Sequence, residues 1–399
     1  MFSSLKIRNF RLYWSGMFIS LVGSWVQTVA QSWLVFSLTN STFLLGLVGF
    51  LSTFPVFALS LFGGVAADRI DKRKILLATQ AAFMVLAFML AFLNQTRLIT
   101  PFQIMIIASL NGIVMAFDGP CRQSVIVELV GREHLLNAIA LNSAAFNSAR
   151  IIGPALAGIL IANIGMSGCF FLNGVSFLAV IVALVMIRSS VENKGKRQNK
   201  HFFRELWEGI EYLKDNRVLL MLIAVVGLTS FFGMPYVIMM PVFAEEILGV
   251  GAKGFGVLMS FVGAGALIAA LSLARMGNFK HKGRALLVSA AVFCLSLMLF
   301  ALSRIFALSL VALVFVGWSS VTAISIINTL LQTLVPDHFR GRIMSAFMFT
   351  FAGVMPFGNL LSGSLAHIWG AANTLFINAA ICFVFFVVIH FAYPQIKRL

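Results

Sequence analysis

Long apolar runs separated by short polar or charged stretches dominate the pattern of this chain. The runs are continuous, about 20 residues long, and do not alternate with period two, so they predict membrane-spanning helices and not barrel strands. We expect twelve spans, at residues 12–38, 43–66, 75–93, 101–121, 135–164, 167–187, 218–243, 254–276, 284–303, 305–328, 342–366 and 373–393. Residues 202–213 have apolar positions at helical spacing and predict an amphipathic surface helix.

A fixed offset relates the two ends of the chain. Shifting by 205 residues aligns Gly153 with Gly358, Gly158 with Gly363, and Gly165 with Gly370. We therefore predict two pseudo-symmetric six-helix bundles, residues 1–188 and 218–399, joined by a basic cytoplasmic linker at 189–217. Two repeated six-helix bundles are an architecture of membrane transporters. In that architecture the substrate site lies between the repeats, near the membrane midplane.

Composition and charge placement fit this all-α membrane class. Hydrophobic residues make up 60% of the chain and charged residues 11%, against about 25% charged in soluble domains. The formal charge is +16, but 25 of the 29 Lys and Arg fall at the two ends or in alternate connections. This asymmetry places both termini in the cytoplasm and argues against a nucleic-acid partner. We expect a monomer in the cell inner membrane, in contact with the lipid bilayer.

One connection carries six charges in seven residues, Asp68 to Lys74, between two apolar runs. The stretch Gly64-x-Ala66-Ala67-Asp68-Arg69-x-x-Lys72-Arg73 resembles the signature of the major facilitator superfamily between its second and third helices, with Asp71 where the family usually has glycine. The resemblance implies a cytoplasmic gate. We assign that gate to Gly64, Asp68, Arg69, Arg73, Asp118 and Arg122.

The fifth span looks like the family's antiporter motif, with alanine at three of the glycine positions. Its matching residues are Ala140, Ala149, Gly153, Pro154, Ala157 and Gly158. In the family this motif marks exporters, so the resemblance implies efflux. The alternative is ordinary close helix packing through small residues.

Further motifs narrow the resemblance to the drug:H+ antiporter branch that includes enterobactin exporters and macrolide efflux proteins. They are Asn9-Phe10-Arg11-Leu12, Gly23-Ser24-Trp25, Asp118-Gly119-Pro120-x-Arg122 and Ala149-Arg150-x-x-Gly153-Pro154. The resemblance covers nearly the whole chain but does not select a substrate, because the branch also contains lysophospholipid transporters. The implied function is export of a siderophore or an amphipathic drug-like molecule by alternating access. A lipid flippase and a non-transporting membrane sensor stay open as alternatives.

Arg150 is the one formal charge well inside a span, about 15 residues or roughly 22 Å from its cytoplasmic start. A buried arginine is costly and usually faces a cavity or a partner. It either binds a polar or anionic substrate group or pairs with a neighbouring helix. The other polar candidates for the substrate cavity are Gln27, Gln31, Asn142, Asn147, Tyr236, Asn328 and Asn359.

No Asp or Glu is expected at the middle of a span, so proton coupling would need Asp118 or the outer pair Glu245 and Glu246 to titrate. Whether protons are a partner is left open. The sequence contains no catalytic triad, phosphate-binding loop or metal-spaced His/Cys cluster. We expect a small-molecule transporter with no enzymatic activity, no cofactor and no metal.

Overall fold

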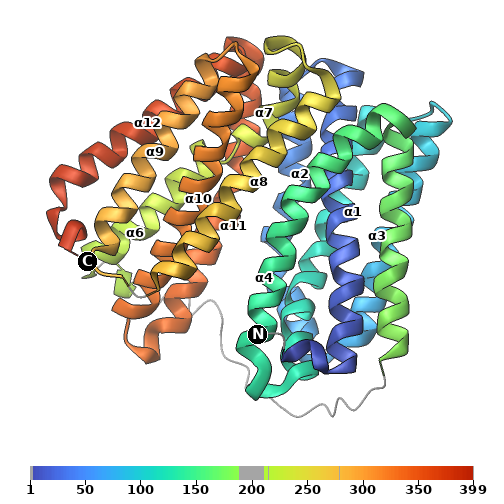
Figure 1. Cartoon of the computed structure of the whole chain (residues 1–399), viewed down its shortest axis with the longest axis horizontal. Helices are drawn as coiled ribbons and strands as arrows, with labels where there is room; N and C mark the ends of the chain where they lie inside the picture. Colours follow the sequence, from blue (N-terminus) through green and yellow to red (C-terminus); the bar gives the residue numbers. More distant parts are fainter. Residues whose placement is uncertain (1–2, 188–210, 214, 278, 399) are drawn as a thin grey trace. The chain divides into compact units, whose positions relative to one another are not determined.

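The described part of the chain is almost entirely helical (Figure 1). The structure, a computed structural model, describes residues 3–187, 211–213, 215–277 and 279–398. The first half contains η1 (Ser4–Lys6), α1 (Arg8–Thr39), α2 (Thr42–Arg69), α3 (Lys72–Gln95) and α4 (Pro101–Met186). The second half contains α6 (Arg217–Leu228), η2 (Thr229–Gly233), α7 (Tyr236–Val242), η3 (Phe243–Ile247), α8 (Gly251–Met276), α9 (Lys282–Leu302), α10 (Phe306–Leu334), α11 (Asp337–Trp369), α12 (Ala371–Ala392) and η4 (Pro394–Arg398).

Two glycines divide α4 into three helices. Gly131 and Gly165 have φ values of 67° and 71°, and these angles break the helix at residues where no Cβ opposes them. We call the resulting segments, residues 101–130, 132–164 and 166–186, the fourth, fifth and sixth spans. The corresponding glycine of the second half, Gly370, also has a positive φ, 83°, so the 205-residue repeat is visible in the backbone.

Ten helices in the described part of the chain are long and apolar enough to cross a membrane. One of them, Glu133–Met186, contains both the fifth and the sixth span. The helical class that the apolar runs predict is thus confirmed, whereas the count of twelve spans and the cytoplasmic termini stay predictions. The predicted amphipathic helix at 202–213 lies outside the described residues except for its last three.

The chain forms two compact units. One unit comprises residues 1–40, 51–197 and 251–260, and the other comprises 41–50, 198–250 and 261–399. The two units therefore exchange the beginnings of two helices. The start of α2 belongs to the second unit, and the start of α8 belongs to the first.

In the first unit, α1 and α3 pack against α4. The core at one end consists of buried side chains from all three helices, including Phe10, Tyr13, Leu76, Cys121 and Ile126. In the second unit, α9 packs against both α10 and α12, as Figure 1 shows for α9 and α12. The four cysteines are free and fully buried in these cores.

One span of the second unit is interrupted twice by π-helical turns, η2 and η3. Single π turns inside α-helices leave backbone carbonyls less regularly bonded and recur at functional sites. The first turn packs against α11, where a Cβ on Gly358 would lie 2.2 Å from the carbonyl oxygen of Phe231. Only glycine allows the two helices to approach so closely.

Candidate functional site

The charged connection forms a two-residue turn, shorter than its run of charges suggests. Helix α2 continues through Arg69 and α3 begins at Lys72, so only Ile70 and Asp71 lie between them. Asp71 caps α3, because its Oδ1 accepts a hydrogen bond of 2.9 Å from the backbone N–H of Arg73. The other charged residues of this stretch therefore belong to the end of α2 or the start of α3, where their side chains can still reach water.

Two basic residues directly after this turn make contacts with other helices of the first unit. Lys72 forms an ion pair with Glu128 at the end of the fourth span. The Nη2 of Arg73 donates a hydrogen bond of 3.0 Å to the carbonyl oxygen of Val185, near the end of the sixth span. Asp68 is exposed, and no described residue pairs with it. The turn is thus fixed to two other helix ends while Asp68 remains accessible.

Asp118 lies at the centre of a buried polar cluster. Its side chain is 0% exposed and its Oδ1 accepts hydrogen bonds from Thr79 Oγ1 at 2.7 Å and from Gln80 Nε2 at 2.8 Å. Its Oδ2 forms an ion pair with Nε of Arg122, one helical turn away. Three donors around one carboxylate offset the cost of burying its charge.

Helix α1 closes this cluster from the other side. Arg122 Nη1 lies 2.9 Å from the sulfur of Met17, and Tyr13 is 2% exposed. The Tyr13 hydroxyl and the Oε1 of Gln80 are buried without a hydrogen-bond partner among the described residues. Sequence reasoning found Asp118 and Arg122 but missed Tyr13, Thr79 and Gln80. The adjacent polar residues Thr79 and Gln80 inside an apolar span were the signal.

Arg150 lies in the middle of the fifth span and is half-buried, with no hydrogen bond or ion pair to any described residue. Ser143 and Asn147 share its helix face at spacings of seven and three residues. The Nδ2 of Asn147 donates a bond of 2.8 Å to the Ser143 carbonyl oxygen, so that amide is partly used within the helix.

Small residues of the antiporter-like stretch bring α1 against the fifth span. A Cβ on Gly153 would lie 2.3 Å from the Cβ of Trp25, and the Trp25 ring meets Phe146 edge-on at 6.1 Å. Ala149 is fully buried, whereas Gly158 lies against the backbone of α8, near Gly256. These contacts place the indole of Trp25 beside the segment that carries Arg150.

The remaining candidates belong to both units. Gln27 is 8% exposed, and its Oε1 accepts a bond of 2.7 Å from Asn173, which joins α1 to the sixth span. Gln31 and Asn142 are half-buried. In the second unit, Tyr236 and Asn359 are 1% and 2% exposed, and Asn328 accepts a bond of 2.6 Å from Gln332.

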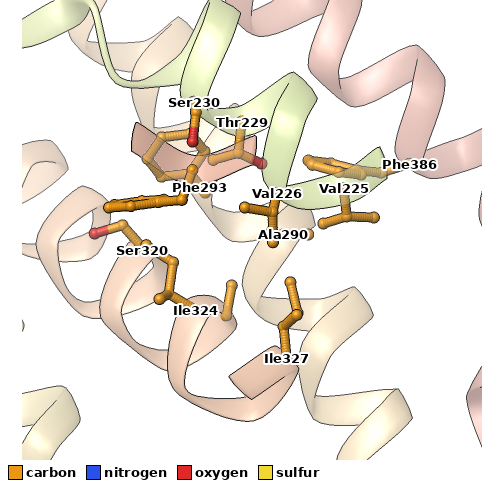
Figure 2. A pocket seen from close by; sticks show the side chains of 12 residues that line it. Val225, Val226, Thr229, Ser230, Ala290, Phe293, Ser320, Ile324, Ile327 and Phe386 are labelled. Carbon is orange, nitrogen blue, oxygen red and sulfur yellow. The ribbon is translucent and has the colours of Figure 1, made fainter. Parts of the chain in front are cut away.

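A narrow cavity lies inside the second unit, between α6, η2, α9, α10, α11 and α12 (Figure 2). Its volume of about 10 Å³ matches the space that one water molecule occupies. Ser230 is 1% exposed, and its hydroxyl has no hydrogen-bond partner among the described residues. The cavity is apolar and too small for a drug-sized ligand, and no pattern in the sequence predicts it.

The sequence matches the model of one protein family along almost its full length. The family is described as transmembrane secretion effectors of the major facilitator superfamily, and the match covers residues 1–398. The chain belongs to this family. The recognition of a major facilitator protein from its charged turn is confirmed, and the chain is a multi-pass integral protein of the bacterial inner membrane.

Three relatives of this chain are transport proteins by name. The staphyloferrin A transporter of Staphylococcus aureus is 23% identical over 391 residues, 97% of each chain. The macrolide efflux protein A of Streptococcus pyogenes is 24% identical, over 94% of this chain and 96% of its own. The enterobactin exporter EntS of Shigella boydii is 26% identical, over 84% and 79%.

A solved structure shows the same fold. The nucleoside transporter NupG superposes on this chain with a TM-score of 0.72 over 99% of both chains, at 14% identity. At this identity the likeness concerns the fold alone. The predicted all-α major facilitator architecture is therefore confirmed.

Proposed function

We propose that this protein exports a siderophore or an amphipathic drug-like molecule from the cytoplasm by alternating access. The observation that carries the proposal is Arg150, a half-buried arginine deep in a span with no described partner. An arginine in this setting binds carboxylate or phenolate oxygens well, because its planar guanidinium offers paired donors. The relatives named for staphyloferrin A, enterobactin and macrolides support export of such molecules.

Export measured with Arg150 variants tests this role. In vesicles or in cells lacking their own exporter, Arg150→Gln and Arg150→Lys should both lose export, because neither retains the paired donors of the guanidinium. Arg97→Gln is the matched control, since Arg97 is an exposed arginine in a turn of the same unit. Export by Arg150→Gln at the rate of the control would remove Arg150 from the substrate site.

The cytoplasmic gate is the second part of the proposal. Lys72 and Arg73 hold the turn against the fourth and sixth spans, which leaves Asp68 and Arg69 exposed at the end of α2. We assign gating to Gly64, Asp68, Arg69, Arg73, Asp118 and Arg122, in agreement with the family signature. Asp68→Asn should slow export while leaving the folded protein intact, whereas Lys74→Gln, at an exposed position in the first turn of α3, should leave export unchanged.

Proton exchange through Asp118 is the third part. The Thr79 hydroxyl has one proton and two acceptors, Asp118 Oδ1 at 2.7 Å and the Leu76 carbonyl oxygen at 3.1 Å. When Asp118 is ionised, Thr79 donates to it. When Asp118 is protonated, Thr79 can donate to Leu76 and accept from the carboxyl group. The cluster can therefore hold either protonation state without leaving the hydroxyl unpaired.

The other titratable groups near Asp118 are Arg122 and Cys121 on its own helix and Tyr13 on α1, with Lys72 and Glu128 close to Cys121. If protons drive export, an imposed pH gradient should accelerate it in the wild type and not in Asp118→Asn. Equal rates with and without the gradient in the wild type would contradict proton coupling and leave the exporter proposal standing. We further propose a monomer without enzymatic activity, which light scattering of the purified protein tests for oligomeric state.

A further inference from the structure

Two aromatic rings of the first unit lie beside Arg150. Trp25 of α1 and Phe146 of the fifth span meet edge-on, with ring centroids 6.1 Å apart and an angle of 66° between the ring planes. Phe146 precedes Arg150 by four residues, so the two side chains are neighbours on one helix face, about 6 Å apart along the axis. The Phe146 side chain is 46% exposed. Part of an aromatic surface is therefore uncovered next to the guanidinium.

The indole of Trp25 extends past the level of Arg150. A Cβ on Gly153 would lie 2.3 Å from the Cβ of Trp25, whereas the Trp25 ring reaches Phe146. Gly153 follows Arg150 by three residues and Phe146 precedes it by four. The arginine therefore lies between the two points of the fifth span that Trp25 contacts, and the indole forms an apolar wall on the α1 side of that span.

A polar side chain lies on the other side of Arg150. Asn147 precedes it by three residues and is half-buried. Its Nδ2 donates a bond of 2.8 Å to the Ser143 carbonyl oxygen, which orients the amide. The Oδ1 of Asn147 accepts no hydrogen bond from a described residue, so it can accept one from a ligand hydroxyl.

Neither α1 nor the fifth span has a carboxylate at the level of Arg150. The sequence of α1, residues 8–39, contains no Asp or Glu, and the fifth span contains Glu133 alone. Glu133 precedes Arg150 by 17 residues, roughly 25 Å of helix. The other acids of the first unit are Asp68, Asp71, Asp118, Glu128 and Glu192, the last of which lies outside the described residues.

Three of these acids are already in use. Asp71 caps α3, Glu128 pairs with Lys72, and Asp118 pairs with Arg122. Asp68 is exposed at the end of α2, next to the charged turn. An anionic group that a ligand brings to Arg150 would therefore meet no competing carboxylate from α1 or from its own helix.

We propose that the exported substrate carries an aromatic acid group, whose ring packs on Phe146 and Trp25 while its carboxylate or phenolate oxygens bind Arg150. This inference rests on the proposed function, because it names the substrate class of the same site. A hydroxyl group next to the acid on the ring donates to Asn147 Oδ1. Aromatic pairs contribute affinity beyond the apolar area that they bury, so Phe146 selects aromatic over aliphatic acids of equal size and charge.

Binding to the purified full chain tests this selectivity. Two acids, 2-naphthoate and its saturated analogue decahydro-2-naphthoate, share their charge and carbon skeleton and differ in aromaticity. Each is titrated against the wild type, with thermal unfolding as the readout. The wild type should bind 2-naphthoate about two- to tenfold more tightly than the saturated acid. Arg150→Gln should weaken binding of both acids about tenfold or more, because a charged hydrogen-bond donor is lost.

Three variants separate the ring of Phe146 from general apolar contact. Phe146→Leu keeps an apolar side chain at a partly exposed position and should abolish the preference for 2-naphthoate. Phe146→Tyr restores an aromatic ring and should retain the preference. Phe18→Leu is the matched control, because Phe18 stacks on Trp14 at 5.7 Å in α1, seven residues before Trp25. It should bind both acids as the wild type does.

Equal affinity of the wild type for the two acids would overturn the proposal, since charge and apolar area would then account for binding. Equal loss of the preference in Phe146→Leu and Phe18→Leu would also overturn it, as would unchanged binding of both acids by Arg150→Gln or no binding of either acid by the wild type. Export is measured separately. Normal export by Arg150→Gln contradicts the proposed function, whereas equal affinity for the two acids contradicts the aromatic selectivity alone.

Discussion

Gly158 of the fifth span and Gly256 of α8 are in backbone contact: a Cβ on Gly256 would lie 2.8 Å from the Cα of Gly158. A second contact of the same kind occurs in the other unit, where a Cβ on Gly363 of α11 would lie 2.6 Å from the Cα of Gly46 on α2. The two contacts correspond through the repeat, since Gly158 aligns with Gly363 and Gly46 with Gly256. One contact holds the start of α8 in the first unit, and the other holds the start of α2 in the second.

Larger side chains at these crossings should abolish export. Gly158→Val and Gly363→Val introduce atoms where the neighbouring backbone already lies, so the helices must separate. Gly119→Ala is the control, because nothing lies within 4 Å of the position its Cβ would take. Export is measured together with the amount of protein in the membrane. Normal export by both valine variants would show that the helices can separate at these contacts without loss of transport.

Loss of the Asp118 carboxylate should destabilise the first unit. Asp118→Asn leaves Arg122 without its ion-pair partner in a buried cluster, at a cost of about 3–5 kcal/mol in the free energy of unfolding. Replacing both residues, Asp118→Asn with Arg122→Gln, should recover part of that loss because no unpaired charge remains. Unfolding by denaturing detergent measures both values. A double variant less stable than the single one would contradict this account.

The ion pair between Lys72 and Glu128 should contribute little to stability. Its side chains are 18% and 25% exposed, and pairs in contact with water typically contribute about 0.2–1 kcal/mol. A double-mutant cycle with Lys72→Gln and Glu128→Gln measures the coupling. We expect a value below about 1 kcal/mol that falls further at high salt. A much larger coupling would mean that the pair is shielded from solvent.

Removal of the Ser230 hydroxyl should stabilise the second unit. The group is buried beside an apolar cavity without a described hydrogen-bond partner (Figure 2), and an unsatisfied buried polar group costs about 1–3 kcal/mol. Ser230→Ala should therefore raise the melting temperature. Ser289→Ala serves as the comparison, because that buried hydroxyl donates a bond of 2.9 Å to the Leu286 carbonyl oxygen. A lower melting temperature for Ser230→Ala would indicate a bound water.

The sequence was sufficient for the helical class, the charged turn and the internal repeat. Continuous apolar runs of this length can cross a membrane only as helices. The charged stretch from Asp68 to Lys74 cannot lie in lipid and must therefore connect two spans. The predicted connection, residues 67–74, is longer than the observed turn, because helix ends can carry charges once their side chains reach water. Asp68 and Arg69 accordingly remain helical in α2.

Two features of the site depend on tertiary packing that no single segment encodes. The donors to Asp118 come from α3, and their register against the fourth span is set by three-dimensional contacts. The π turns in the span that contains Tyr236 have no composition signal, because one extra residue in a helical turn changes only the backbone bonding.

The buried cysteines have a practical consequence. Because Cys121, Cys169, Cys294 and Cys382 are each 0% exposed, a water-soluble maleimide should leave the native thiols of the folded chain unmodified. A single cysteine placed at Asp68 would then be the one accessible label, and its rate of modification would report how open that end of α2 is during each step of the transport cycle.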